Sequence, residues 1–307
     1  MKPILLMGPT ASGKTAVATE LAQHFPFEIV SVDSAMVFRH MDIGTAKPDR
    51  GTLSVAPHHL IDIIDPTERY SAGRFQSDAA KIMSEIIERG KIPLLVGGTM
   101  LYFKALAEGL NALPKADMVI RAQLDGKAKR LGWPELHREL AMIDPSTASR
   151  LEPTDSQRIQ RALEIWLISG KPMSELLMHE KEVPRYDYIR IALIPSERSV
   201  LHQRIAMRFE SMLQAGLIDE TEALRKKFEL DLSMPSMRTV GYRQAWQYLD
   251  GEFGRGELIE KGVAATRQLA KRQLTWLRSM ENVKHFDCID PHMGRNVKIF
   301  LREAFDR

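Results

Sequence analysis

Residues 8–15 read Gly-Pro-Thr-Ala-Ser-Gly-Lys-Thr, which is a complete G-x-x-x-x-G-K-[ST] phosphate-binding loop. The apolar run Ile4–Met7 precedes the loop and a helical pattern over Ala16–His24 follows it, so the motif has the strand–loop–helix context that it requires. The two glycines allow a tight turn in which several backbone N–H groups point at one anion, and the helix N-terminus adds its positive dipole end. We therefore expect the chain to bind a diphosphate or a triphosphate.

Two side chains of this loop carry chemistry of their own. Lys14 supplies a mobile positive charge, and the hydroxyl of Thr15 is suited to Mg²⁺, which makes it the candidate metal ligand. A chance glycine-rich turn is the competing interpretation, but it does not explain the strand and the helix on either side. The residues expected to bind diphosphate or nucleotide are Gly8, Pro9, Thr10, Ala11, Ser12, Gly13, Lys14 and Thr15.

Composition limits the class of protein. The 307 residues suffice for one large domain or two modest ones, and 44% hydrophobic with 27% charged residues is ordinary for a globular protein. The net charge of +3 permits a nucleic-acid partner without requiring one. A single cysteine, Cys288, excludes an intrachain disulfide and a cysteine-clustered zinc site. Without a secretion signal or an apolar run of about eighteen residues, we expect a cytoplasmic monomer with no membrane partner.

The first hundred residues alternate strand and helix signals, which predicts an α/β fold with a parallel sheet flanked by helices. Strands are expected at Phe27–Val32, His59–Ile64 and Ile92–Val96, with a helix from Ala72 to Arg89. In such sheets ligands bind beyond the carboxyl ends of the strands. The phosphate loop, Asp33 and Thr99 all follow strands directly, so we expect them to converge.

The pattern changes between residues 113 and 185, where short helices replace the alternation, and Tyr188–Ile194 returns to strand. We predict a P-loop NTPase-like core over residues 1–112 and 186–307, with C-terminal helices. An all-helical insertion domain over residues 113–185 interrupts this core.

Asp33 and Thr99 are the polar residues whose positions most suggest chemistry. An acid at the end of a buried strand beside a phosphate loop can be a Mg²⁺ ligand, a general base or a helix cap. Thr99, after Gly97-Gly98, can donate a hydrogen bond to a phosphoryl oxygen or cap the helix that follows. The sequence alone leaves these alternatives open.

Basic residues recur at helical spacing in three places: Arg158 and Arg161, with the neutral Gln157 beside them; Arg204 and Arg208; and Arg267, Lys271 and Arg278. One such face is usually just solvated, but three of them on a chain with a phosphate loop favour a polyanionic partner modestly. The segment Arg238–Arg243 suits phosphate contact and base stacking, yet it is equally a turn leading into the helix that carries Trp246.

Taken together, these segments closely resemble bacterial tRNA dimethylallyltransferases. The resemblance covers nearly the whole chain in order and thins after about residue 285. The segments that carry it are residues 8–15, 33–34, 41–48 (Met-Asp-Ile-Gly-Thr-Ala-Lys-Pro), 96–99, 240–243 and 267–273 (Arg-Gln-Leu-Ala-Lys-Arg-Gln). It implies transfer of a dimethylallyl group from dimethylallyl diphosphate to N6 of the adenosine just 3′ of the tRNA anticodon (position 37), with release of diphosphate.

The resemblance also implies roles for individual residues. Asp33 matches the general base on the adenine amine, Thr99 a hydrogen-bond donor at the reacting centre and Arg208 a diphosphate-binding arginine. The helical insertion matches the part that clamps the anticodon stem-loop. The chain departs from the family pattern at residues 35–38, Ala-Met-Val-Phe, where many members carry Gln and Tyr. The positions that match tRNA contacts are Asp33, Ser34, Ala35, Met36, Thr99, Arg121, Gln157, Arg158, Ile159, Gln160, Arg161, Arg238, Thr239, Val240, Gly241, Tyr242 and Arg243.

Two other functions fit parts of the pattern. A P-loop kinase acting on a small metabolite would share the core through Thr99, with Arg204 and Arg208 closing over ATP, but it does not explain the basic insertion or residues 238–243. An RNA-binding ATPase without covalent chemistry leaves Asp33 and Thr99 without a role. Formation of ADP would favour the kinase, and formation of prenylated adenosine the transferase.

Overall fold

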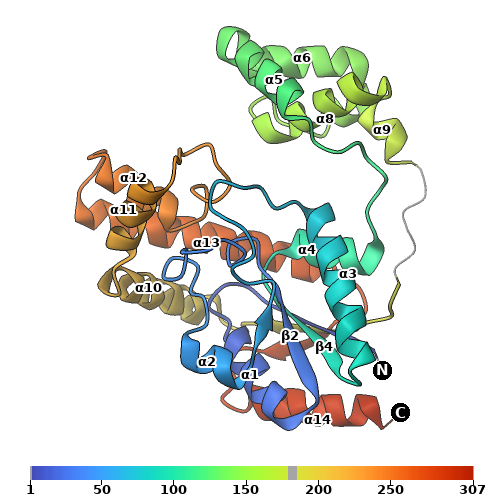
Figure 1. Cartoon of the computed structure of the whole chain (residues 1–307), viewed down its shortest axis with the longest axis vertical. Coiled ribbons are helices and arrows are strands. Elements are labelled where there is room, and N and C mark those ends of the chain that lie inside the picture. Colours follow the sequence, from blue (N-terminus) through green and yellow to red (C-terminus); the bar gives the residue numbers. More distant parts are fainter. Residues whose placement is uncertain (1, 179–184, 307) are drawn as a thin grey trace. The chain divides into compact units, whose positions relative to one another are not determined.

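The computed structural model describes residues 2–178 and 185–306, and the chain divides into two compact units. The core unit comprises Met1–Ala107 and Arg185–Arg307, and the helical unit comprises Glu108–Pro184 (Figure 1). Part of the predicted insertion, residues 179–184, lies outside the described residues. No helix of the described chain is long and apolar enough to cross a membrane.

A six-stranded sheet, all of whose described pairings are parallel, forms the centre of the core unit and confirms the predicted α/β class. Its two central strands, Ile4–Met7 and Ile92–Gly97, are apolar runs buried on both faces, as is usual for a parallel sheet that helices cover on both sides. In spatial order they are β3 (His58–His59), β2 (Phe27–Val32), β4 (Ile92–Gly97), β1 (Ile4–Met7), β5 (Ile189–Ile194) and β6 (Lys284–Asp287).

The strand predicted at His59–Ile64 is wrong beyond His59. Only His58 and His59 pair with β2, because Leu60 and Asp62 adopt positive φ angles of 63° and 56° that turn the chain out of the ladder. Ile64 instead makes an isolated parallel bridge to Phe38. The loop after β2 is therefore held against residues 60–64, beside the carboxyl end of the sheet.

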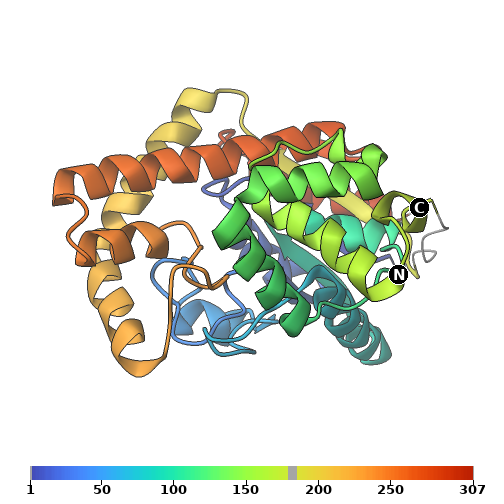
Figure 2. The same ribbon diagram turned by 90° about the horizontal axis from the view of Figure 1, so that it is seen from above.

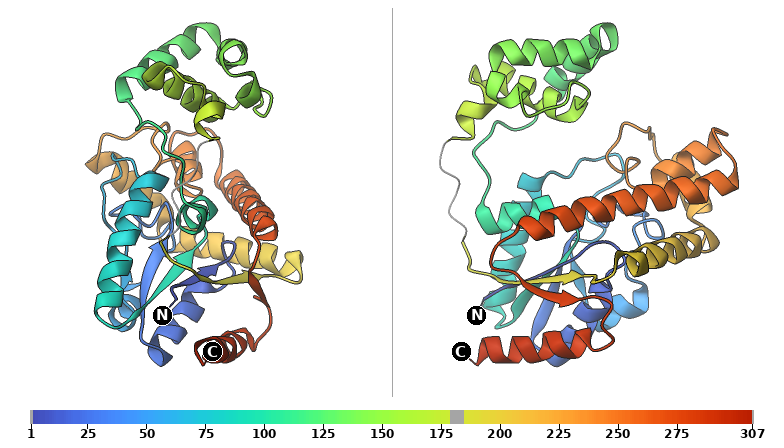
Figure 3. Two further views of the ribbon diagram at one scale, coloured as in Figure 1. Left: turned by 90° about the vertical axis from the view of Figure 1, so that its right-hand side faces the viewer. Right: turned by 180° about the vertical axis from the view of Figure 1, so that it is seen from behind.

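Alternate residues of the strands enter two hydrophobic clusters, one on each face of the sheet. Ile4 and Leu6 pack with helices α1 (Lys14–His24) and α14 (Met293–Phe305). Leu5 and Met7 pack in the cluster that also holds residues of α3 (Ala72–Glu88) and α4 (Met100–Glu108). Figure 3 shows these layers on either side of the sheet. A short helix, α2 (Arg50–Val55), precedes β3.

A third cluster joins the C-terminal helices to the loop after β2. Helix α13 (Arg255–Ser279) is a single helix of 25 residues that packs against α10 (Arg198–Gln214) and α12 (Tyr242–Leu249) (Figure 2). Helix α11 (Leu217–Lys227) packs against α12. Val37, Phe38 and Met41 are buried in the same cluster. The helices thus form one wall of the space above the sheet.

The helical unit has a small core of its own. Its helices are α5 (Met118–Leu131), α6 (Trp133–Ile143), α7 (Pro145–Ala148), α8 (Ser156–Ser169) and α9 (Met173–Leu176). Leucines of α5, α6 and α8 interlock around Ile159 and Ala162. Asp155 caps α8 by accepting from the Arg158 amide, and Gly170, with a φ of 68°, ends the helix.

Candidate active site

The carboxyl ends of β1, β2 and β4 open into one cavity of about 490 Å³ in the core unit. Lys14 and Thr15 of the phosphate loop, Asp33 after β2, Thr99 after β4 and Arg208 of α10 all line it. The expected convergence of the loop, Asp33 and Thr99 is therefore confirmed. It follows from the parallel sheet, because neighbouring parallel strands deliver their following residues to the same edge.

The phosphate loop has the backbone shape that an anion cradle needs. Gly13 adopts a φ of 82° directly before α1, and Ala11 also lies in the left-handed region with a φ of 63°. A Cβ at Gly8 would lie 2.6 Å from Ser12 Oγ and 3.0 Å from the carbonyl oxygen of Leu193. Glycine is thus required at residue 8 by close packing and at residue 13 by its backbone conformation.

Lys14 has no carboxylate partner among the described residues. Its ammonium donates to the carbonyl oxygen of Pro9 at 2.6 Å and lies 3.5 Å from Ser12 Oγ. Burial, and then the positive charge of Arg208, lower the pKa of Lys14 to about 8, while Asp33 opposes this shift. The ammonium is therefore half-buried without an ion pair among the described residues, and the charge of Asp33 only partly offsets the cost.

Arg208 is in the same situation. No hydrogen bond or ion pair of its guanidinium is found within the part of the chain that the structure describes. Burial lowers the pKa of Arg208, and the charge of Asp33 only partly offsets this effect. Its neighbour one turn earlier, Arg204, donates to the carbonyl oxygen of Cys288 at 2.9 Å. Lys14 and Arg208 also line a second cavity of about 330 Å³ along residues 11–16, so they form one positively charged site.

Asp33 lies at the end of β2 with one carboxylate oxygen engaged. Asp33 Oδ1 accepts from the amides of Ala35 at 2.8 Å and of Met36 at 3.3 Å. These two bonds hold the carboxylate in a fixed orientation at the cavity wall. They cap a turn rather than a helix, because the next helix after Asp33 begins only at Arg50.

Thr99 is tied to the residue that follows Asp33. Its hydroxyl oxygen accepts from the Ser34 amide at 3.0 Å and donates to Ser34 Oγ at 3.3 Å. The Thr99 amide donates to the carbonyl oxygen of Val32 at 3.2 Å, so two strand ends are joined by three bonds. Thr99 thus supports the loop that carries Asp33, and its side chain faces the same cavity.

The cavity offers few ligands for the metal expected at Thr15. The described residues contain no group of three or more His, Cys, Asp or Glu side chains that could hold a metal ion. Thr15 lines the cavity together with Asp33, so the site offers a hydroxyl and a carboxylate. Such a sparse set of oxygens suits Mg²⁺, which keeps several waters and binds chiefly through substrate phosphates.

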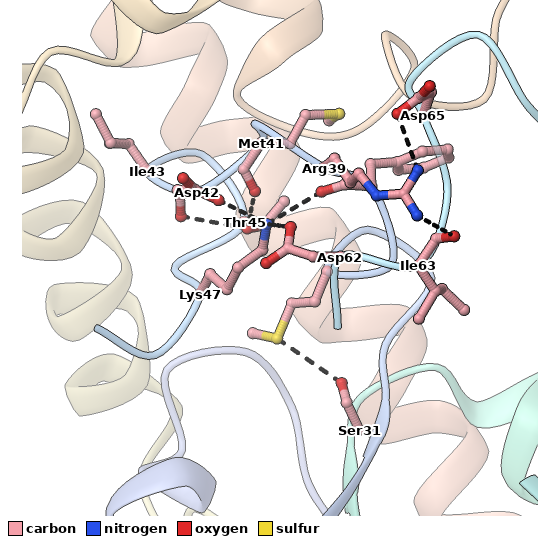
Figure 4. A network of polar contacts seen from close by, with 12 residues as sticks. Ser31, Arg39, Met41, Asp42, Ile43, Thr45, Lys47, Asp62, Ile63 and Asp65 are labelled. Atoms are coloured by element: carbon pink, nitrogen blue, oxygen red, sulfur yellow. Dashed lines mark hydrogen bonds and ion pairs between the residues drawn. The ribbon is translucent and has the colours of Figure 1, made fainter. Parts of the chain in front are cut away.

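The loop 41–48, to which sequence reasoning gave no role, forms a wall of the cavity and is held by a buried lysine (Figure 4). The Lys47 side chain is 4% exposed and donates to Asp42 and Asp62, at 2.6 Å each, and to the carbonyl oxygen of Phe38 at 3.0 Å. Thr45 Oγ1 donates to the Met41 carbonyl oxygen at 2.6 Å. All three donors of the Lys47 ammonium are therefore satisfied within the protein.

A carboxylate from α11 fixes the other side of this loop. Glu220 accepts from the backbone amides of Asp42, Ile43 and Gly44 and from the hydroxyl of Tyr242. The Tyr242 side chain is 0% exposed, and a Cβ at Gly44 would lie 2.4 Å from its ring. The Tyr242 ring therefore has no free face for a base, and the turn interpretation of residues 238–243 describes the structure, since α12 begins at Tyr242. Gly241 is buried as well.

The remaining predicted contact residues fall into two groups. Arg238, Thr239, Val240, Ser34, Ala35 and Met36 line the cavity of the core unit, whereas Arg243 is exposed away from that lining. Arg121, Gln157, Arg158, Ile159, Gln160 and Arg161 belong to the helical unit.

In the helical unit, most of these side chains already have partners. Glu164 is 0% exposed and accepts from Arg121 at 2.8 and 3.0 Å and from Arg161 at 2.6 Å. Ile159 is buried in the core of the unit. Gln160 donates to Asp125 at 2.7 Å. Gln157 and Arg158 are exposed, so they are the members of this group that are most open to a partner.

An apolar wall of the cavity was missed by sequence reasoning. Ile205, Phe209 and Met212 on α10 face it, as do Leu269 and Trp276 on α13. The spacing 205, 209 and 212 is an ordinary helical stripe, which usually indicates core packing. Only their neighbour Arg208 could have suggested that this stripe borders a charged site. Gln273 of α13 also lines the cavity and was not identified.

Comparison with known proteins gave consistent matches. The family model described as IPP transferase matches residues 36–280. A curated protein of Dechloromonas aromatica named tRNA dimethylallyltransferase is 58% identical over 96% of this chain and 94% of its own length. One of Chromobacterium violaceum with the same name is 60% identical over 91% of this chain and 87% of its own length.

Solved structures give the same picture. The tRNA isopentenylpyrophosphate transferase of Bacillus halodurans superposes with a TM-score of 0.73 at 37% identity, covering 99% of this chain and 97% of that one. A eukaryotic dimethylallyltransferase acting on tRNA superposes with a TM-score of 0.83 at 26% identity, covering 99% and 79%.

Proposed function

Because the chain belongs to the IPP transferase family, we propose that it transfers a dimethylallyl group from dimethylallyl diphosphate to N6 of the tRNA adenosine just 3′ of the anticodon. The observation that carries this proposal is a pair of half-buried cations, Lys14 and Arg208, without a carboxylate partner in the described chain. They line the same cavity as Asp33 and an apolar wall. An anionic leaving group, a base and an apolar transferred group are the three things such a cavity accommodates.

The phosphate loop and Arg208 act on the leaving group. When the allylic C–O bond breaks, negative charge develops on diphosphate and positive charge on the prenyl carbon. Lys14, Arg208 and the backbone amides at the start of α1 stabilise that negative charge where it forms, and they need no rearrangement to do so. The apolar wall, with Phe209 and Trp276, accommodates the prenyl group and limits access of water to it.

Asp33 acts on the acceptor. The adenine amine is a weak nucleophile, because its lone pair is delocalised into the ring. As the new N–C bond forms, one amine proton passes to Asp33, whose orientation is set by the amides of Ala35 and Met36. Such general-base assistance contributes roughly 10²–10⁴-fold to a rate. Thr99, whose hydroxyl faces the same cavity, is positioned to bond the acceptor base.

We propose Mg²⁺ as the metal of this reaction. Bound to diphosphate oxygens, it would neutralise part of the charge of the leaving group. Thr15 is the residue proposed to hold it, since its hydroxyl lines the cavity beside Lys14.

The tRNA is proposed to contact both units. Arg238 and Arg243 are exposed on the core unit, and Gln157 and Arg158 on the helical unit, so all four can reach phosphates. The target adenosine is stacked between its neighbours in an ordinary anticodon loop, so its base must flip out of the loop to reach Asp33. A tRNA substrate also makes the cytoplasm the expected compartment.

The P-loop kinase alternative has less support. Family membership favours the transferase, and a kinase cavity has no need of the apolar surface contributed by Ile205, Phe209, Leu269 and Trp276.

One experiment tests the proposal directly. The protein is incubated with unmodified tRNA, dimethylallyl diphosphate and Mg²⁺, and the nucleosides are analysed by mass spectrometry. We expect N6-dimethylallyladenosine from the wild type. Asp33→Asn, which keeps the oxygen that accepts from Ala35, should retain tRNA affinity and lose turnover by a factor of about 10² or more. ADP from ATP without prenylated nucleoside would overturn the proposal in favour of a kinase.

A further inference from the structure

We propose that Gln273 is a positioning residue that holds the diphosphate-binding loop at a fixed distance from the Thr99 segment. It thereby sets how closely the donor carbon and the acceptor nitrogen approach. The inference rests on the proposed function, because it assigns Gln273 a task within that reaction. It also gives a role to the last residue of the segment 267–273, whose sequence carries part of the family resemblance.

The side-chain amide of Gln273 joins two strand ends. Gln273 lies in α13 and is 8% exposed. Its Oε1 accepts from the backbone amide of Thr10 at 2.8 Å, and its Nε2 donates to the carbonyl oxygen of Gly98 at 2.9 Å. Thr10 follows β1 and Gly98 follows β4, which are neighbouring strands. One planar group thus spans the space between the two loops.

The space around this bridge is tight. A Cβ at Gly98 would lie 2.4 Å from Nε2 of Gln273 and 3.4 Å from the carbonyl oxygen of Gly8. Residue 98 therefore has to be glycine for the bridge to exist. Because the loops are in contact through Gln273, they can neither close further nor separate without breaking one of its two bonds.

The bridge continues toward both reacting groups. On one side, Thr10 leads into the loop residues 11–15, which approach the leaving group. On the other side, Gly98 precedes Thr99, whose hydroxyl accepts from the amide of Ser34, the residue after Asp33. The phosphate loop and the segment that carries Asp33 are therefore connected by the hydrogen bonds of Gln273 and Thr99.

This geometry refines the predicted diphosphate cradle. The amide of Thr10 is already engaged by Gln273 at 2.8 Å, so it is not free to bond an anion. The amide of Ser12 donates to the Pro9 carbonyl oxygen at 3.3 Å, which shapes the loop. Thr10 therefore belongs to the support of the loop, and the leaving group is met by other amides of the loop, among them those at the start of α1.

Glutamine meets the requirements of the bridge at every pH, which an ionisable side chain of the same length does not. The group must accept from an N–H on one side and donate to a carbonyl oxygen on the other, at the reach of two methylene groups. An ionised glutamate would bond Thr10 but place a negative oxygen against the Gly98 carbonyl. Methionine has a similar length and offers no comparable donor. These two substitutions therefore separate the chemistry of the bridge from its volume.

The first test compares matched substitutions on one helix. Gln273→Met removes both bonds, whereas Gln268→Met changes an exposed glutamine that has no hydrogen-bond partner in the described chain. At saturating donor and tRNA, we expect Gln273→Met to lower kcat by about 10²-fold, since misplacing reacting groups by about 1 Å has effects of that size. The Kd for tRNA should stay within about twofold. Gln268→Met should behave as the wild type.

The second test uses pH, because a protonated carboxyl group can replace an amide. In Gln273→Glu, the neutral acid has a carbonyl that can accept from Thr10 and a hydroxyl that can donate to Gly98. The ratio of kcat for Gln273→Glu to kcat for Gln273→Met should therefore rise as pH falls through the pKa of the new carboxyl group. The other titratable groups that line the cavity are common to both variants and cancel in this ratio. They are Lys14, Asp33, His58, Arg208, Arg238 and Arg272.

A kcat for Gln273→Met close to that of an active wild type would overturn the inference while leaving the proposed function intact. A flat kcat ratio across the pH range would also overturn it, even if both variants were slow, because a loss of fold alone does not depend on protonation at residue 273. If the wild type formed no prenylated adenosine, the proposed function would fail, and this inference with it.

Discussion

The phosphate loop and the loop 41–48 line one cavity, yet their lysines meet opposite surroundings. Lys47 has two carboxylates and a carbonyl oxygen as partners, all within 3.0 Å. Lys14 has a carbonyl oxygen and a distant hydroxyl, and no carboxylate in the described chain. A buried ammonium that the protein satisfies belongs to the architecture. Lys14, whose ammonium has no ion pair within the described chain, has instead the environment of a ligand site.

The arginines show the same contrast on a larger scale. Arg121 and Arg161 share the fully buried Glu164 in the helical unit, whereas Arg208 in the core unit has no ion pair among the described residues. Both units are rich in basic residues, so charge counts alone would treat them alike. Whether an arginine has an ion pair distinguishes a residue that stabilises the fold from one that is available to bind a ligand.

The largest effect is expected for Arg208→Met. Removing a cation from the leaving-group site should lower kcat/KM for dimethylallyl diphosphate by about 10³-fold, or about 4 kcal/mol of transition-state stabilisation. The melting temperature should stay level or rise, because a half-buried charge without an ion pair in the described chain is costly to the fold. Steady-state kinetics and thermal unfolding measure the two effects. Arg198→Met, at the exposed start of α10, is the control. A lower Tm with unchanged kinetics would make Arg208 a structural residue.

Glu164→Gln should have the opposite profile. It leaves Arg121 and Arg161 without their shared carboxylate and weakens the bond from the Asp117 amide. Breaking a buried ion pair costs about 3 kcal/mol or more, and we expect the lower limit because both arginines are partly exposed. Hydrogen exchange of α5 and α8 in the whole protein would report the loss. Glu152→Gln, exposed in the same unit, should change little. Unchanged protection in α5 and α8 would show that this pairing does not support the unit.

Much of the core unit could be predicted from sequence, because its signals are local. The phosphate loop carries its own glycines, and apolar runs followed by Asp33 and by Thr99 mark strand ends that a parallel sheet must bring together. The last strand, β6, was missed, since Lys284-His285-Phe286-Asp287 has only one apolar residue. Strand β6 follows α13, so its pairing with β5 depends on where the C-terminal end of that helix lies.

The rest of the site depends on contacts between distant residues. Gln273 lies 263 residues from Thr10, and Glu220 lies 176 residues from Gly44. No residue near Gln273 or Glu220 in the sequence predicts which residue it contacts. Glu164 did carry a signal, since it stands three residues after Arg161 on one helix face, and that spacing favours an ion pair. A carboxylate inside an apolar stripe could therefore have predicted that these arginines are paired.

A smaller effect is expected when the two lysines are exchanged for methionine. Lys47→Met loses two charge-assisted hydrogen bonds, and stability should fall by about 2 kcal/mol. The loss is limited because the Asp42 and Asp62 side chains are 62% and 45% exposed and can be hydrated. Lys14→Met should instead raise the free energy of unfolding, because it removes an ammonium that has no ion pair among the described residues. Urea denaturation of both variants measures the difference. If both lost stability equally, the distinction between the two lysines would be wrong.

The smallest effect concerns pH. Burial lowers the pKa of Lys14 from the ordinary value of 10.5 to about 8 in the folded protein. Between these values the unfolded chain holds a proton that the folded chain has lost, so raising the pH stabilises the folded state. The slope is at most about 1.4 kcal/mol per pH unit from this one group. It should appear as a difference in urea stability between the wild type and Lys14→Met, in which all other titrations are shared.

Diphosphate gives this measurement its control. A bound anion supplies the negative charge that Lys14 lacks, so it should raise the pKa of the ammonium toward its ordinary value and remove the slope above pH 8. The same anion should leave the Lys47 contribution unaffected, because that ammonium already has two carboxylates. A slope that persisted under saturating diphosphate would mean that the anion does not bind at Lys14. The unpaired lysine would then be a cost of the fold rather than part of a leaving-group site.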